Sequence, residues 1–165
     1  MPRFRPEEMF RALEAHAVRY VLIGGLAATL HGSPLRTGDA DICPARDAEN
    51  LERLARALEA MDARIRAPDA KAGVRFACDA RFLAGVELLN LTTRFGDLDI
   101  AFRPAGTGGY DDLLQGAERY DLEGLVVPVA SLPDVIRSKK AADRPKDHAA
   151  LDTLQELLRR RKRPT

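Results

Sequence analysis

Two long stretches of the chain, residues 6–18 and 47–61, carry apolar residues at every third or fourth position. The repeating positions are Phe10, Leu13 and Ala17 in the first stretch and Leu51, Leu54 and Leu58 in the second. This spacing places the apolar side chains on one side of a helix. The pattern therefore predicts two amphipathic helices, the second with Asp47 as its N-cap.

Short runs of apolar and β-branched residues elsewhere in the chain predict β-strands. The runs cover residues 20–23, 39–43, 63–66, 74–77, 86–93, 97–102, 118–122 and 125–129, with a loop over residues 68–73. Further helices are expected over residues 26–31, 110–116, 131–140 and 145–161. Only three residues separate 86–93 from 97–102, which is short enough for a hairpin. Strands and helices in this order predict an α/β (α+β) fold, in which helices flank a mixed, twisted β-sheet.

The overall composition is that of one globular domain. The chain has 165 residues, of which 45% are hydrophobic and 31% charged, and a net charge of +1. This balance gives no general attraction to nucleic acid or to a membrane surface. No apolar run approaches the ~20 residues of a membrane span, and residues 1–8 lack the apolar segment of a secretory signal. We therefore expect a cytoplasmic protein without a membrane partner.

The cysteine and aromatic content narrows the possible chemistry further. Cys43 and Cys78 are the only cysteines, and neither belongs to a CxxC pair or has a histidine close by in the sequence. This arrangement favours reduced, structural cysteines over a disulfide or a zinc site. The chain has no tryptophan and only 5% aromatic residues, so a surface that stacks on single-stranded bases is not expected.

The strand predicted over residues 39–43 carries two carboxylates at alternate positions. Asp39 and Asp41 flank Ala40, and alternate side chains of a strand point to the same face. Two neighbouring carboxylates repel each other, and burying them is costly unless a cation or a hydrogen-bond donor is present. Magnesium binds oxygen ligands, commonly one or two carboxylates together with phosphates. The pair is therefore a candidate magnesium site.

A second pair, Asp97 and Asp99, repeats this arrangement on a later strand. Asp99 lies between Leu98 and Ile100, as a residue in a strand interior would. If the two strands are neighbours, Asp39, Asp41 and Asp99 converge into a site for two metal ions. Taken singly, each Asp-x-Asp pair is more often an exposed turn or the solvent face of a strand. Whether Asp97 contributes stays open.

Gly24 and Gly25 follow the strand predicted over residues 20–23 and precede a predicted helix. Glycines allow a phosphate to approach the backbone closely, and a helix N-terminus favours an anion. A tight turn would explain the two glycines equally well. Their position just before the strand with Asp39 and Asp41 favours the phosphate-binding interpretation.

This order of motifs resembles the DNA polymerase β-like nucleotidyltransferase superfamily. The matching residues are Gly24-Gly25, Asp39-Ala40-Asp41 and Asp99. The Arg36-Thr37 pair looks like that of bacterial members, which have an Arg-Thr pair just before the aspartates. The segments Ile136-Arg137-Ser138-Lys139-Lys140 and Arg144-Pro145-Lys146-Asp147 look like the helical end of the small bacterial AbiEii-like, toxin-type group. The resemblance covers residues 18–157 and implies a single nucleotidyltransferase domain over residues 1–165, with a basic tail at 159–165.

The resemblance implies transfer of a nucleoside monophosphate from a nucleoside triphosphate to a hydroxyl group. Asp39 and Asp41 would hold two Mg²⁺ ions, and Asp99 would join one ion and serve or position the general base. The nucleotide would be bound by Gly24, Gly25, Ser33, Arg36, Thr37, Lys139 and Lys146. Many members of the superfamily have serine at the position of Gly25, so here backbone contacts or Ser33 would take its place.

The acceptor of the nucleotide stays open at this stage. The resemblance to the toxin-type group favours RNA, tRNA or a protein, with an antitoxin protein as a possible partner. A small-molecule acceptor, as in antibiotic-modifying members, is an alternative that we expect to need a larger acceptor-binding domain. A non-catalytic protein that binds a nucleotide or a partner is a third interpretation. The cations at residues 159–163 would bind RNA or simply favour a helix C-terminus, and His31 is expected to line the cleft.

Overall fold

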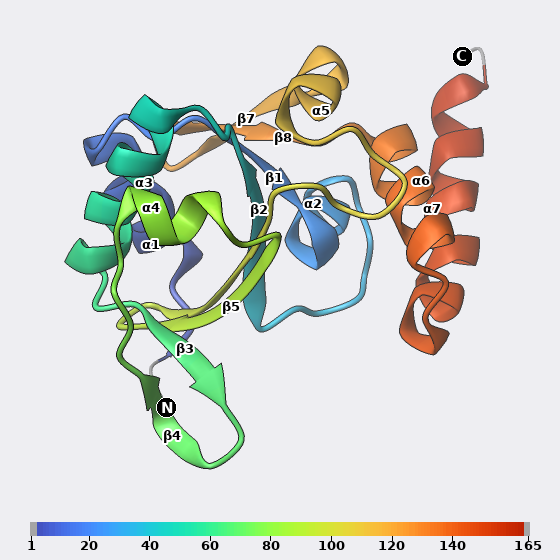
Figure 1. Ribbon diagram of the computed structural model, residues 1–165. Helices are drawn as coiled ribbons and strands as arrows, with labels where there is room; N and C mark the ends of the chain where they lie inside the picture. The colour runs from blue at the N-terminus through green and yellow to red at the C-terminus, as the bar shows by residue number, and fades with distance from the viewer. Residues whose placement is uncertain (1–2, 164–165) are drawn as a thin grey trace.

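The computed structural model describes residues 3–163 and is drawn in Figure 1. The helices are α1 (Pro6–Ala15), α2 (Gly24–Leu30), α3 (Ala48–Ala60), α4 (Ala80–Ala84), α5 (Tyr110–Gly116), α6 (Leu132–Ala142) and α7 (Pro145–Lys162). The strands are β1 (Tyr20–Ile23), β2 (Asp39–Pro44), β3 (Arg64–Ala67), β4 (Ala70–Val74), β5 (Leu88–Thr93), β6 (Gly96–Ala101), β7 (Glu118–Leu122) and β8 (Leu125–Val129).

All the described strands belong to one sheet, in the order β4-β3-β5-β6-β2-β1-β8-β7. The pairs β2–β6 and β1–β8 are parallel, and the other neighbouring pairs are antiparallel. Figure 1 shows α1, α3 and α4 on one side of the sheet and α2, α6 and α7 on the other. The prediction of a mixed sheet flanked by helices is therefore confirmed.

The face of the sheet toward α1 and α3 is apolar. Ala40, Ile42, Leu98 and Ile100 point to this side and are at most 1% exposed. Burying a large aliphatic side chain stabilises the fold by about 1.5–3 kcal/mol. Because strand side chains alternate, a shift of one residue would turn these groups out and turn the aspartates of β2 and β6 into the core. The apolar residues thus fix the register that presents the aspartates on the opposite face.

Several element boundaries follow the sequence pattern closely. The strands β1, β7 and β8 and the helix α5 have the bounds that the pattern predicts. Asp47 caps α3 as predicted, since its side chain accepts a hydrogen bond from the backbone N–H of Asn50. The hairpin β5–β6 also forms as predicted.

Other boundaries differ from the prediction. The strand predicted over residues 74–77 is wrong, because β4 instead occupies most of the predicted loop at 68–73 and pairs with β3. Gly73 (φ +76°) allows this pairing, since a Cβ there would lie 2.7 Å from Cβ of Arg64. Helix α2 begins at Gly24, two residues before its predicted start, and α1 ends at Ala15, short of residue 18. Helix α4 was not predicted.

Both cysteines are free, as predicted from the sequence. Burial raises the pKa of the Cys43 thiol to about 12. Burial also raises the pKa of Cys78, to about 11. These are structural thiols. No helix in the described range is long and apolar enough to cross a membrane.

Candidate metal and nucleotide site

The parallel pairing of β2 and β6 brings the two Asp-x-Asp pairs together. Asp39 lies opposite Asp97, and Asp41 lies opposite Asp99. Asp39, Asp41 and Asp99 each place one carboxylate oxygen within 4.8 Å of the other two. The two strands are therefore neighbours, as the convergence of the three carboxylates requires.

The protein itself only partly compensates the negative charge of this cluster. Burial, followed by the charges of Asp39 and Asp99, raises the pKa of Asp41 to about 7, although Lys146 and Lys139 act in the opposite direction. Burial also raises the pKa of Asp99. A divalent cation would remove this repulsion, and three carboxylate oxygens are the donors that Mg²⁺ prefers. The residues present therefore fit a magnesium site.

Gly24 lets the start of α2 lie against the cluster. Its φ of +69° belongs to the left-handed region that favours glycine, and a Cβ there would lie 2.4 Å from Oδ2 of Asp41. A side chain at this position would displace the carboxylate. The requirement for glycine at residue 24 thus comes from the approach of α2 to the site as well as from the turn.

The fold of the chain resembles those of solved nucleotidyltransferase structures. Lincomycin-bound LnuA, a lincosamide antibiotic adenylyltransferase, matches with a TM-score of 0.59 and 17% identity, over 94% of this chain and 99% of LnuA. The chain has the nucleotidyltransferase fold. TM1012 of Thermotoga maritima, a proposed nucleotidyltransferase, matches this fold with a TM-score of 0.52 and 20% identity, over 96% of this chain and 97% of TM1012.

A third nucleotidyltransferase-fold neighbour is ANT(2'')-Ia, an antibiotic-resistance factor. Its TM-score is 0.53 at 15% identity, over 94% of this chain and 90% of ANT(2'')-Ia. No protein-family profile and no curated protein sequence matches the chain. At 15–20% identity these neighbours establish the fold, while the resemblance to the AbiEii-like group stays a prediction.

The glycine at position 25, where many nucleotidyltransferases have serine, has a local steric reason. A Cβ on Gly25 would lie 3.2 Å from Oγ1 and 3.3 Å from Cβ of Thr37. Any side chain at residue 25 would therefore crowd this threonine. Thr37 in turn donates a hydrogen bond of 2.8 Å to Oδ1 of Asp39, so its position matters for the cluster.

Ser33 and Arg36, the other loop residues expected to bind the nucleotide, differ in their exposure to solvent. Ser33 is buried, and its Oγ accepts a hydrogen bond from the backbone N–H of Leu35, at 3.3 Å. Arg36 is exposed in the same loop. The structure therefore gives Ser33 a role in the loop itself and leaves the side chain of Arg36 on the surface.

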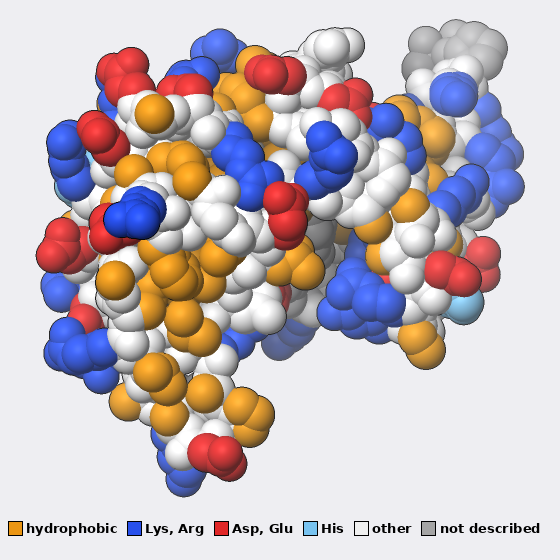
Figure 2. Space-filling model, viewed as in Figure 1, with side chains coloured by type: hydrophobic (Ala, Val, Ile, Leu, Met, Phe, Trp, Pro, Cys, Tyr) orange, Lys and Arg blue, Asp and Glu red, His pale blue; other side chains and the backbone are white. Residues whose placement is uncertain are grey.

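The corner between α6 and α7 brings cations toward the cluster. Lys139 and Lys146 both lower the pKa of Asp41, which places their charges near the carboxylates. Lys139 Nζ also lies 3.6 Å from the fully buried Asp147, whose Oδ2 accepts a 2.7 Å hydrogen bond from Arg144 Nε. Figure 2 shows Lys and Arg side chains where the α6–α7 lobe faces the rest of the molecule, beside a hollow.

The charge state of Asp147 is set by its neighbours. Burial alone would raise the pKa of this carboxyl, but the hydrogen bonds and charge of Arg144, with the charge of Lys139, hold it below the usual value. Asp147 is therefore an anion that fixes the α6–α7 corner. This arrangement orients Lys139 at the edge of the site.

One residue of the site was missed by the sequence analysis. Arg66, on β3, places Nη2 2.7 Å from Oδ1 of Asp99 and Nη1 3.6 Å from Oδ2 of Asp97. Nη1 also donates a 3.0 Å hydrogen bond to the backbone carbonyl of Leu91. Only the pairing of β3 beside β5 brings this arginine to the cluster, so no local pattern around residue 66 would have revealed it.

His31 does not line the cleft, so this prediction is wrong. Its side chain is completely buried, and Nε2 lies 2.7 Å from the carbonyl oxygen of Ala130. The hydroxyl of Tyr120 and Nη2 of Arg161 each lie 3.1 Å from Nδ1. His31 therefore joins α2 to the end of α7.

The basic tail is partly neutralised within the chain. Arg159 and Arg160 both contact Glu156, and Arg161 lies 3.9 Å from Glu118. Residues 164–165 of the predicted tail lie outside the described residues. The arginines from 159 to 161 thus have acidic partners on the protein surface, and RNA binding by the tail stays a prediction.

Proposed function

We propose that this protein is a Mg²⁺-dependent nucleotidyltransferase that transfers a nucleoside monophosphate to a hydroxyl group of a small molecule. The observation that carries the proposal is the convergence of Asp39, Asp41 and Asp99 beside the glycine turn at Gly24. The nucleotidyltransferase fold of the chain supports the same conclusion.

Asp39 and Asp41 would hold two Mg²⁺ ions, and Asp99 would join one of them. Bound magnesium would neutralise charge on the triphosphate and on the transferring phosphoryl group. Thr37 would keep Asp39 in place through its 2.8 Å hydrogen bond. Gly24 and Gly25 would present backbone to the phosphates.

The reaction needs one bond to form and one to break. The acceptor oxygen would attack the α-phosphorus, and the bond from that phosphorus to the bridging oxygen of pyrophosphate would break. Asp99, whose pKa is raised by burial, would accept or direct the proton of the acceptor hydroxyl. Lys139, Lys146 and Arg36 would carry the charge of the triphosphate and of the departing pyrophosphate, a role mainly of positioning and electrostatics. Ser33 would contribute through the shape of its loop.

The small-molecule acceptor is supported by the sizes of the structural neighbours. LnuA is described as a lincosamide antibiotic adenylyltransferase, and the match covers 99% of that chain and 94% of this one. A larger acceptor-binding domain, as expected from the sequence, is therefore no prerequisite for such an acceptor. RNA, tRNA or protein acceptors and an antitoxin partner remain predictions.

A labelled-transfer assay tests this proposal. The protein is incubated with Mg²⁺ and each α-³²P-labelled nucleoside triphosphate, against lincosamides, aminoglycosides, total bacterial RNA and cell lysate. An Asp39→Asn/Asp41→Asn variant, checked for folding by circular dichroism, is the control. We expect label on a small molecule with the native chain only.

Each other result has a clear meaning. Label on RNA or protein that depends on the aspartates would keep the transferase and refute the small-molecule acceptor. Absence of transfer to every acceptor, with nucleotide binding retained, would favour a non-catalytic nucleotide-binding protein. Label that persists in the double variant would refute the assignment of the site.

A further inference from the structure

The carboxylate of Asp99 has a cationic partner within the chain. Arg66 Nη2 lies 2.7 Å from Oδ1 of Asp99, and the arginine side chain is 32% exposed. The same guanidinium lies 3.6 Å from Asp97 and donates a hydrogen bond to the carbonyl of Leu91. A single arginine thus bridges the second Asp-x-Asp pair and the neighbouring strand.

The backbone around Arg66 is irregular. The recorded β3–β5 pairs are Arg64 with Thr92 and Ile65 with Leu91, and the register of β3 against β4 shifts between Ile65 and Ala67. Such irregularities redirect a side chain relative to a regular strand. The β3–β5 pairs involve Arg64 and Ile65, so the contact of Arg66 with Asp99 is made by its side chain beyond these pairs.

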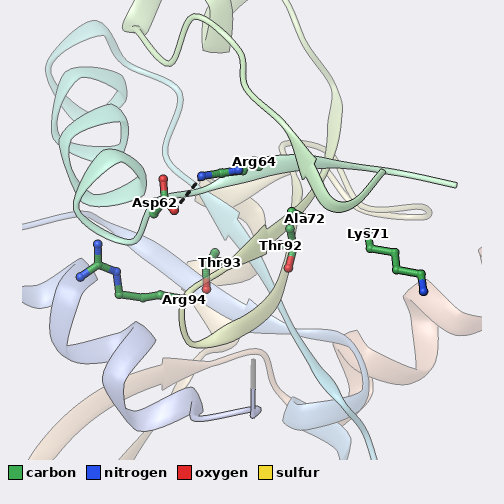
Figure 3. A pocket seen from close by; sticks show the side chains of 7 residues that line it. All are labelled: Asp62, Arg64, Lys71, Ala72, Thr92, Thr93 and Arg94. Carbon is green, nitrogen blue, oxygen red and sulfur yellow. Dashed lines mark hydrogen bonds and ion pairs between the residues drawn. The ribbon is translucent and has the colours of Figure 1, made fainter. Parts of the chain in front are cut away.

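Arg64 on the same strand provides an internal comparison. It forms its ion pair with Asp62, at 3.3 Å, and not with the aspartate cluster. Figure 3 shows this pair together with Lys71, Thr92 and Arg94. These residues line a cavity of about 380 Å³. The two arginines therefore have similar chemistry and neighbouring positions, but only Arg66 contacts a candidate metal ligand.

A guanidinium and a divalent cation compete for the same acidic group. Both use the negative charge of Asp99, and two cations held at one small cluster repel each other. Lys139 and Lys146 add further positive charge near the cluster, since both lower the pKa of Asp41. A metal ion bound at Oδ1 of Asp99 would therefore compete with Arg66 for this oxygen.

We propose that Arg66 is a positioning residue that holds Asp99 in the metal-free protein and is displaced when a divalent cation binds to the cluster. This inference rests on the proposed function in one respect, namely that Asp39, Asp41 and Asp99 bind metal. Arg66 orients Asp99 toward the other carboxylates before metal binds and reduces the affinity of the cluster for metal. After displacement its guanidinium is free to meet the substrates.

Mn²⁺ binding measured by isothermal titration calorimetry tests the competition. Arg66→Gln removes the cation, and we expect it to bind Mn²⁺ about 5–20-fold more tightly than the native chain, within the range of common coupling energies. Arg66→Lys keeps a cation and should remain close to native. Arg64→Gln is the matched control, with less than about a twofold change expected because it contacts no residue of the cluster.

The sign of the effect separates this role from a structural one. A purely structural Arg66 would leave Mn²⁺ affinity unchanged or weaker in Arg66→Gln, and either result in a folded variant overturns the proposal. Equal gains in Arg66→Gln and Arg64→Gln would also overturn it, since the effect would then be general charge removal.

A second measurement on the native chain covers the case in which Arg66→Gln does not fold. The side-chain N–H signals of Arg66 are followed by NMR, assigned with Arg66→Lys, while Mg²⁺ is added. We expect the restricted, hydrogen-bonded Nη signals to give way to those of a freely rotating guanidinium. Signals that stay unchanged at saturating metal would overturn the proposal.

The proposed function can fail separately. If Mn²⁺ binding is saturable and disappears in Asp39→Asn/Asp41→Asn, the metal site is supported. If Arg66→Gln then shows no gain in Mn²⁺ affinity, only the proposed role of Arg66 is refuted. Absence of Mn²⁺ binding to the native chain refutes the metal site, and with it both proposals.

Discussion

Replacing Asp41 with asparagine should stabilise the metal-free protein while removing metal binding. Burial and two neighbouring carboxylates raise the pKa of Asp41 from 3.8 to about 7. Each unit of pKa shift is worth about 1.4 kcal/mol, so the ionised carboxylate costs the fold up to about 4 kcal/mol at pH 8. Asparagine keeps the shape without the charge, and we expect a gain of about 2–4 kcal/mol at pH 8, or roughly 5–10 °C in Tm.

The pH dependence of this gain follows from the direction of the shift. A carboxyl with a raised pKa binds its proton more tightly in the folded state than in the unfolded chain. Its contribution to stability is therefore present below about pH 4 and is lost as pH rises toward about 7. The asparagine side chain does not titrate, so the stability gap between Asp41→Asn and the native chain should grow by roughly 2 kcal/mol from pH 5 to pH 8.

Thermal unfolding in EDTA, followed by circular dichroism at both pH values, measures this gap. Asp152→Asn, an exposed position on α7, is the control and should show no such growth. Added Mg²⁺ should stabilise only the native chain and close the gap. A destabilising effect of Asp41→Asn at pH 8, or a gap of equal size at both pH values, would refute the reasoning.

Three further predictions concern the glycine turn, Asp147 and Cys43. Gly24→Ala should abolish Mn²⁺ binding in calorimetry, because the new Cβ would lie 2.4 Å from Asp41, whereas Gly25→Ala, with a closest contact of 3.2 Å, should retain it. Asp147→Ala should lower the free energy of unfolding in urea by about 2 kcal/mol, because it removes the charge-assisted hydrogen bonds that this buried carboxylate accepts from the backbone and side-chain N–H groups of Arg144; a loss under ~0.5 kcal/mol would contradict this role. Cys43 should react with a disulfide reagent at pH 8 only after unfolding, and fast reaction in the native state would contradict its burial.

Much of the secondary structure could be predicted because it depends on local patterns. The strands at 20–23, 118–122 and 125–129 each lie next to a glycine-containing turn, at Gly24 or at Glu123-Gly124, and the structure keeps their predicted bounds. The cap at Asp47 needs only a carboxylate next to the first turn of a helix. The second strand of the β3–β4 hairpin was misplaced because its pairing depends on Gly73 fitting against β3, which is a tertiary contact.

The candidate site was likewise only partly predictable from the sequence. The shared face of Asp39 and Asp41 follows from the two-residue period of a strand, so the sequence determines it. Asp99 meets these residues only because β2 pairs in parallel with β6. The sequence alone could not establish that the two strands are neighbours.

The sequence by itself thus determined the approximate places of most strands and helices, and which carboxylates share a face. Tertiary structure alone decided that Arg66 reaches Asp99, that Asp147 is buried beside Lys139, and that His31 is enclosed away from the site. The physical reason is that periodicity and capping act within a few residues. The order of the strands instead depends on how much apolar surface the whole sheet buries. This burial involves contacts between segments that are far apart in the chain.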